Sequence, residues 1–296
     1  RGDILCMYPE ARYSPCGTTS YLPDSLGMIV KMSKVPVVAV VHRGNYLHAP
    51  FWNFRKKRKV PLHTTLTKIL TPEEIERMTP AEINEVIRNS LQYDDYKYQK
   101  ENGILITEPY RAEGLHKVLY QCPHCLTESK MASAGTELHC TACGKRWSWR
   151  EDGHLEALEG ETEFDHIPDW FAWEREQVRQ DILDGRYKLD TEVDIAMLVD
   201  FQAIYKVGTG HLTHDLTGFH LTGCDGKLSY SQGPVACYSV YSDYYWYEIG
   251  DMICIGDQET LYYCFPQDGG DVVAKTRLAA EELYKMKKQR RVKAGV

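Results

Sequence analysis

Residues 122–125 read Cys122-Pro123-His124-Cys125, and residues 140–144 read Cys140-Thr141-Ala142-Cys143-Gly144. Each C-x-x-C turn brings two sulfurs close enough to share one metal ion, and the stretch between the turns leaves room for two facing hairpins. Zn²⁺ prefers four tetrahedral thiolate or imidazole ligands. We therefore predict a zinc ribbon over residues 119–150, with a structural zinc ion held by Cys122, Cys125, Cys140 and Cys143.

Other interpretations of these cysteines are a redox-active C-x-x-C pair and reduced core cysteines. A catalytic zinc ion fits less well, because four thiolates leave no open position for water. His124 and His139 could each replace a sulfur, but we interpret both as bystanders. Zinc supplies about 10 kcal/mol of apparent folding free energy to such a module. Chelation is therefore expected to unfold residues 119–150 first.

The composition of the chain sets the broad class of the protein. A length of 296 residues with 43% hydrophobic content is enough for two or three domains. The net charge of −7 creates no overall field that attracts nucleic acid. The ten cysteines are too few for a disulfide scaffold, which favours a reducing, cytoplasmic compartment. The first residues carry neither an initiator Met nor a signal-peptide pattern, so the chain is expected to begin inside a domain.

Residues 1–118 form the first of four predicted segments, an α/β domain. The apolar runs Asp3–Tyr8 and Val35–Val41 are short and bounded by turn residues, as expected of buried parallel strands. Two helices should begin at Thr71 and Thr79, because each Thr is followed by Pro and, three residues on, by Glu.

The zinc ribbon is the second segment, and two more follow it. Residues 151–190 form a helical linker, with a helix predicted over residues 168–183. Residues 191–296 form a mainly antiparallel β domain closed by a C-terminal helix over residues 276–288. The order of elements in this domain is reminiscent of pleckstrin-homology-like or GRAM-like modules. Its many Tyr residues are interpreted as cross-strand packing and are assigned no site.

Two short blocks in the first segment resemble those of a known enzyme family. Residues 8–14, Tyr-Pro-Glu-Ala-Arg-Tyr-Ser, resemble the F-P-E-G-T-R-S block of the glycerolipid acyltransferases, which include the lysophosphatidate acyltransferases. Residues 34–40, Lys-Val-Pro-Val-Val-Ala-Val, resemble the later V-P-[IV]-[IV]-P-V block, and Arg43-Gly44 follows where the family often has glycine. The order and separation of the blocks also fit, and the resemblance covers roughly residues 1–70.

The resemblance implies that Glu10 contacts the substrate and that Arg12 is the nearest cation for its phosphate. The chain departs from the family pattern at several positions in an ungapped match. Ala11 stands in place of Gly, Arg12 in place of Thr, Tyr13 in place of Arg, and Ala39 in place of Pro.

The family's catalytic block, a His and an Asp separated by four residues, precedes the glutamate block and has no counterpart here. His211-Leu212-Thr213-His214-Asp215 has different spacings and lies in the β domain, so we reject it as the catalytic pair. The resemblance thus implies that the full protein is an O-acyltransferase of phospholipid synthesis and that residues 1–296 alone are inactive. The acyl donor would be acyl-CoA or acyl carrier protein, and the acceptor lysophosphatidate or glycerol phosphate.

Residues 51–59 join three aromatic residues to five consecutive cations. This pattern suits the interface of an anionic bilayer, and the protein would then lie peripherally on the inner face of the membrane. The predicted membrane-contact residues are Trp52, Phe54, Arg55, Lys56, Lys57, Arg58 and Lys59. The simpler alternative is a solvated basic loop.

A second class of function also fits the sequence. The chain could be a non-catalytic zinc-ribbon protein that recognises protein or nucleic acid, with a degenerate acyltransferase-like part. Aromatic residues beside cations also suit single-stranded nucleic acid, but the acidic net charge argues against that partner.

Overall fold

The computed structural model describes residues 3–200, 202–267 and 272–294, with side chains as far as residue 289. The chain divides into two compact units. Unit 1 comprises Arg1–Arg111 and Arg150–His154, and unit 2 comprises Ala112–Trp149 and Leu155–Val296. The predicted ribbon, linker helix and β domain thus share one unit, apart from a short turn. No helix in the described part of the chain has the length and apolar composition needed to cross a bilayer.

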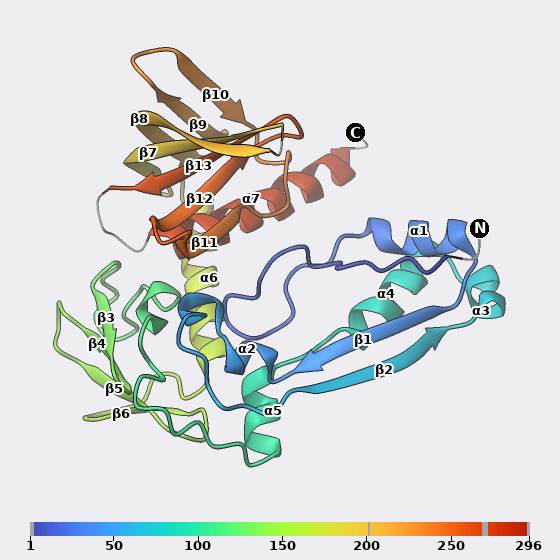
Figure 1. Cartoon of the computed structure of the whole chain (residues 1–296), viewed down its shortest axis with the longest axis horizontal. Helices are drawn as coiled ribbons and strands as arrows, with labels where there is room; N and C mark the ends of the chain where they lie inside the picture. Colours follow the sequence, from blue (N-terminus) through green and yellow to red (C-terminus); the bar gives the residue numbers. More distant parts are fainter. Residues whose placement is uncertain (1–2, 201, 268–271, 295–296) are drawn as a thin grey trace. The chain divides into compact units, whose positions relative to one another are not determined.

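Unit 1 consists of a two-stranded antiparallel sheet and several short helices (Figure 1). Leu22, Leu26, Leu70 and Ile83 belong to its apolar core. The strands are β1 (Val37–Arg43) and β2 (His63–Leu70), and the helices are α1 (Ser25–Ser33), α2 (Asn45–His48), η1 (Phe51–Asn53), α3 (Pro72–Arg77), α4 (Pro80–Ser90) and α5 (Asp95–Glu101).

Both predicted capping boxes in unit 1 are confirmed. The Thr71 hydroxyl accepts from the Glu74 N–H, and the Glu74 carboxylate accepts from the Thr71 N–H, so α3 begins where the sequence predicts. Thr79 and Glu82 form the same pair at the start of α4. These local hydrogen bonds satisfy backbone donors that have no partner inside the helix.

The predicted parallel layer of unit 1 is wrong. Residues 3–8 contain no strand, and Ile4 is 97% exposed. β1 occupies the second predicted run, but it pairs antiparallel with β2. An apolar run becomes a parallel strand only when a neighbouring strand takes up its backbone groups, and no described strand pairs with residues 3–8.

Unit 2 begins with the ribbon, whose four-stranded antiparallel sheet has the order β3-β4-β5-β6. Leu138, Trp147 and Trp149 are fully buried in it. The elements are η2 (Leu115–Lys117), β3 (Met131–Ala134), β4 (Glu137–Cys140), β5 (Arg146–Trp149) and β6 (Leu155–Ala157).

A long helix and a large sheet complete unit 2, and they confirm the predicted antiparallel β domain with its C-terminal helix. Helix α6 (Ile167–Leu183) follows the ribbon, and α7 (Val272–Ala294) packs on α6 and on the sheet (Figure 1). The sheet has the order β10-β9-β8-β7-β13-β12-β11, with every pair antiparallel. Its strands are β7 (Leu189–Val199), β8 (Ala203–Asp215), β9 (Gly218–Gly223), β10 (Leu228–Gln232), β11 (Tyr241–Trp246), β12 (Gly250–Gly256) and β13 (Thr260–Pro266).

Candidate metal centre

The four predicted ligands come together at one point of the ribbon. All four cysteine sulfurs lie within 4.8 Å of one another. The Sγ atoms of Cys122 and Cys143 are 3.8 Å apart, and those of Cys125 and Cys140 are 3.7 Å apart. Four sulfurs around a zinc ion with bonds of about 2.3 Å are about 3.8 Å apart in a tetrahedron, whereas a disulfide bond is about 2.0 Å long. The cluster therefore has the spacing of a four-thiolate metal site.

The two turns that carry the ligands have the same backbone geometry. The N–H of Leu126 donates to the Cys122 carbonyl at 2.9 Å, and the N–H of Gly144 donates to the Cys140 carbonyl at 2.9 Å. Leu126 has φ +63° and Gly144 has φ +80°, a region that glycine adopts more readily than other residues. The glycine after the second pair of cysteines is thus explained by its conformation. Leu126 adopts the corresponding conformation at a cost in folding free energy.

The cysteines differ in their environment. Cys122 and Cys140 are buried, Cys125 is half-buried and Cys143 is exposed. Burial raises the pKa of the Cys122 thiol. Burial also acts to raise the pKa of Cys125, but hydrogen bonds with the Thr127 hydroxyl and backbone outweigh it and lower that pKa to about 6. The lowered pKa favours the thiolate form of Cys125, which is the form that binds metal.

Helix α6 holds the first cysteine turn in place. The Glu174 carboxylate accepts from the Gln121 N–H at 2.9 Å, and the Trp170 indole donates to the Gln121 carbonyl at 3.0 Å. The Trp170 ring also lies edge-on to Trp147 of the ribbon, with 5.0 Å between centroids. Glu174 and Trp170 are fully buried. Both backbone groups of the residue before Cys122 are therefore fixed by the helix.

The sequence interpretation missed this support. The signal was a carboxylate on the apolar side of the helix, because Glu174 lies four residues after Trp170 and four before Val178. A charged residue at such a position usually has a buried partner.

An ion pair joins the ribbon segment to the large sheet. The Lys117 ammonium lies 2.6 and 2.8 Å from the two carboxylate oxygens of Asp251 and 3.7 Å from the centre of the Tyr245 ring. The Tyr244 hydroxyl donates to the Lys117 carbonyl at 2.7 Å. The metal cluster is thus part of a module anchored to both α6 and the β domain.

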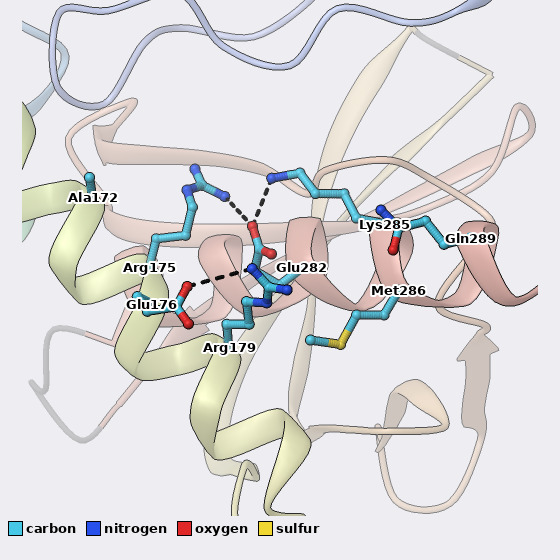
Figure 2. A pocket seen from close by; sticks show the side chains of 8 residues that line it. All are labelled: Ala172, Arg175, Glu176, Arg179, Glu282, Lys285, Met286 and Gln289. Atoms are coloured by element: carbon cyan, nitrogen blue, oxygen red, sulfur yellow. Dashed lines mark hydrogen bonds and ion pairs between the residues drawn. The ribbon is translucent and has the colours of Figure 1, made fainter.

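A groove of about 260 Å³ lies between α6 and α7. Figure 2 shows Arg175 of α6 and Lys285 of α7 reaching the same carboxylate, Glu282, at 3.0 and 2.7 Å. Arg175 also pairs with Glu281 at 2.7 Å. Because these charges already face opposite charges inside the protein, we interpret the groove as a clamp between the helices and assign it no ligand.

The predicted substrate residues lie in a loop of unit 1. The Ala11 N–H donates to the Tyr8 carbonyl at 3.1 Å, so residues 8–11 form a turn. The Glu10 carboxylate accepts from the Ser20 N–H at 2.9 Å, and the Arg12 guanidinium donates to the Ala11 carbonyl at 2.7 Å. Both side chains are half-buried.

The residues of the predicted membrane-contact segment are partly exposed and partly buried. Phe54, Arg55, Lys56, Lys57 and Lys59 are exposed. The prediction is wrong for Trp52 and Arg58, which are 0% and 1% exposed.

The physical reason is a network inside unit 1. The Arg58 guanidinium stacks 4.8 Å from the centre of the Trp52 ring and donates to the Leu47 carbonyl at 3.3 Å. It also donates to the Arg111 carbonyl. Burial lowers the pKa of Arg58 to about 10.

The histidines of the rejected catalytic pair have separate surroundings. His211 is half-buried, with its Nδ1 2.9 Å from a carboxylate oxygen of Glu192. His214 is buried, stacks on Phe219 with 3.7 Å between centroids, and lies 2.9 Å from the Tyr187 hydroxyl. Burial lowers the pKa of His214 to about 3. His214 is thus a neutral core residue at physiological pH.

No protein-family model, no curated protein sequence and no solved structure matches the chain.

Proposed function

We propose that this chain is part of a membrane-associated enzyme that moves a fatty acyl group from a thioester donor to a hydroxyl of lysophosphatidate or glycerol phosphate. The observation that carries this assignment is the conformation of the turn at residues 8–11. Ala11 has φ +48°, and it stands where the F-P-E-G-T-R-S block has glycine. Glycine adopts positive φ without the clash that other residues meet. The backbone conformation therefore supports the correspondence at a position where the residue types differ.

A second observation supports the same function. Asp95 links the segments that follow the two resembling blocks. The Asp95 carboxylate accepts from the N–H groups of Gly44 and Tyr46 at 3.2 and 3.1 Å, and its own N–H donates to the Gly17 carbonyl at 3.0 Å. The loop after the glutamate block and the end of β1 therefore lie together, as one substrate site requires.

In the proposed reaction, the catalytic His and Asp come from a segment before Arg1. The His takes the proton of the acceptor hydroxyl while that oxygen attacks the thioester carbonyl. The new carbon–oxygen bond forms the ester, the carbon–sulfur bond breaks, and the donor leaves as a thiol. Glu10 orients the glycerol hydroxyl and Arg12 binds the phosphate. Holding both substrates in line lowers the barrier by several kcal/mol.

The exposed cations after η1 would bind the enzyme to the anionic membrane that contains its substrate. Arg55, Lys56, Lys57 and Lys59 follow Phe54 in the sequence, and all five side chains are exposed. Each cation near an anionic bilayer contributes about 1 kcal/mol to binding.

Acyl transfer from acyl-CoA or acyl carrier protein to lysophosphatidate in vesicles tests the function in a protein that includes the segment before Arg1. We expect Glu10→Gln to lower kcat/KM by at least about tenfold. The matched control is Glu76→Gln, an exposed glutamate of α3. Absence of transfer with both donors would overturn the assignment, and equal effects of the two variants would remove Glu10 from the site.

The ion held by the four cysteines is zinc in this function. Four thiolates in a tetrahedral arrangement suit Zn²⁺ or iron, and the closed set leaves no open position for catalysis. Zinc would therefore order the ribbon and take no part in acyl transfer. Elemental analysis should find one zinc per chain, and an equimolar iron content would contradict the identity of the metal.

A further inference from the structure

A row of hydrogen-bonded side chains runs from the end of β8 across β9 to β10, at one edge of the large sheet (Figure 1). The Asp215 carboxylate accepts from the Thr217 hydroxyl at 2.6 Å. The Thr217 hydroxyl oxygen is 2.9 Å from His220 Nε2, and His220 Nδ1 is 2.9 Å from the Ser231 hydroxyl oxygen. Thr217 and Ser231 are exposed, whereas Asp215 and His220 are half-buried. Solvent can therefore reach the Ser231 end of the row.

The direction of each hydrogen bond in the row follows from its partners. Hydrogen bonds from the Thr217 hydroxyl and N–H outweigh partial burial and lower the pKa of the Asp215 carboxyl below its ordinary value. Asp215 is therefore an anion at neutral pH and only accepts. Thr217 has a single hydroxyl proton, which it donates to Asp215, so His220 Nε2 carries the proton in the bond to Thr217. The Nδ1 lone pair is then left to accept the Ser231 hydroxyl proton.

The strand register brings Ser231 beside His220 and turns the Ser231 N–H outward. The Cys224 N–H donates to the Thr209 carbonyl at 3.0 Å, so hydrogen-bonded pairs between β8 and β9 fall at every second position and include Thr213 with His220. The His220 backbone therefore faces β8, and His220 forms a non-hydrogen-bonded pair with Ser231, the kind in which side chains are closer. The Ser231 N–H points away from β9, and β10 is the outermost strand of the described sheet. This N–H can donate to a ligand at the sheet edge.

We propose that Ser231 is a nucleophile toward carboxylic esters, and that strands β8 to β10 carry an esterase site. The Ser231 oxygen attacks the ester carbonyl carbon and forms a new carbon–oxygen bond, while its proton passes to His220 Nδ1. The bond to the alcohol oxygen breaks, and the alcohol leaves with that proton. Water, deprotonated by the same nitrogen, then attacks the acyl-serine, and the acid and the free Ser231 hydroxyl are the products.

The other groups of the row support these steps. The Asp215 anion, acting through Thr217, stabilises the positive imidazolium that forms when His220 takes the proton. Asp215 and Thr217 are therefore positioning residues. The Ser231 N–H donates to the oxyanion of the tetrahedral intermediate. Because Ser231 lies on an exposed strand, the site suits small esters that approach from solvent. All of these residues belong to unit 2, so the site is separate from the acyl transfer proposed for unit 1.

Labelling with an alkyl fluorophosphonate, which phosphonylates activated serines, tests the nucleophile in the unsubstituted chain. Peptide fragmentation in the mass spectrometer locates the added mass. Ser229 is a control within the same strand, because it is exposed as Ser231 is but lies opposite Thr222, which is no base. We expect Ser231 to be labelled at least about a hundredfold faster than Ser229. Equal rates at the two serines would overturn the proposal, and this comparison does not depend on the folding of a variant.

Three substitutions separate catalysis from a purely structural role of the row. His220→Gln removes the base and should slow both the labelling of Ser231 and the hydrolysis of p-nitrophenyl acetate that Ser231→Ala abolishes, by at least about a hundredfold. Thr217→Val disconnects Asp215 and should cause a smaller loss of both rates, whereas Thr217→Ser, which keeps the hydroxyl, should retain them. Circular dichroism checks that each variant is folded. Unchanged labelling of Ser231 in folded His220→Gln would show that the row is structural only.

Discussion

Replacement of one buried cysteine ligand should separate the metal's contribution to stability from ordinary packing. Cys140→Ser removes a thiolate that lies 3.7 Å from Cys125 Sγ. A structural zinc ion supplies about 10 kcal/mol of apparent folding free energy, and a folded domain is stable by about 5–15 kcal/mol in total. Loss of the ion is therefore sufficient to unfold the ribbon.

The unfolding should extend into α6. The ribbon covers Trp170, through the contact with Trp147, and supplies the Gln121 N–H to Glu174. Uncovering a large apolar side chain costs about 1.5–3 kcal/mol, and the buried carboxylate loses a donor as well. We expect residues 167–183 to exchange amide hydrogens together with residues 119–149, before strands β8 to β10.

A matched substitution controls for the change from sulfur to oxygen. Cys264 of β13 is 0% exposed, as Cys140 is, and it lies outside the cluster. The Cys264→Ser protein should keep the zinc ion of the ribbon. Its free energy of unfolding should fall by about 1–3 kcal/mol, the cost of burying a poorly satisfied hydroxyl.

Zinc content, urea unfolding and hydrogen exchange by mass spectrometry are the measurements for both variants. We expect Cys140→Ser to lose its zinc and the protection of the ribbon and α6. The reasoning is refuted if Cys140→Ser retains one zinc per chain and unfolds as Cys264→Ser does.

Three further outcomes are expected. Leu126→Gly should raise the free energy of unfolding by about 1 kcal/mol by removing an unfavourable positive φ, and Gly144→Ala should lower it similarly; urea unfolding with zinc present measures both. Lys117→Met should lower the free energy of unfolding by about 1–3 kcal/mol, because Asp251 loses its ammonium partner. The loss should be smaller when Asp251→Asn is added. Arg175→Met should raise the pH of acid unfolding. Burial acts to raise the pKa of the Glu281 carboxyl, but the charges of Arg175 and Arg277 outweigh it and lower that pKa to about 2 from 4.5. The stabilisation that the ionised Glu281 gives the fold is therefore complete above pH 4.5 and is lost toward pH 2. An unchanged midpoint of acid unfolding, measured by circular dichroism, would contradict this prediction.

The features that the sequence predicted correctly are local ones. The C-x-x-C turns place two ligands within four residues, and the Thr-Pro-x-Glu starts satisfy their donors within one helical turn. Period-two alternation likewise predicted the antiparallel β domain, because a strand with one buried face shows it in its own residues. Each of these depends on neighbours along the chain.

The features that required the tertiary structure depend on residues far away in the chain. Trp52 and Arg58 look like membrane-contact residues by composition, yet the Arg58 guanidinium donates to the carbonyl of Arg111. Asp95 gave no signal of its role, because its partners Gly44 and Tyr46 lie about fifty residues earlier.

The metal centre illustrates both cases. Its four ligands could be read from the spacing of the cysteines, whereas Glu174 and Trp170, which fix the backbone before Cys122, could not. Ligand spacing is set by the geometry of a single turn, which a few residues encode. Burial and long-range hydrogen bonding are set by which surfaces meet when the chain folds, and the energies that select those surfaces are summed over many distant contacts.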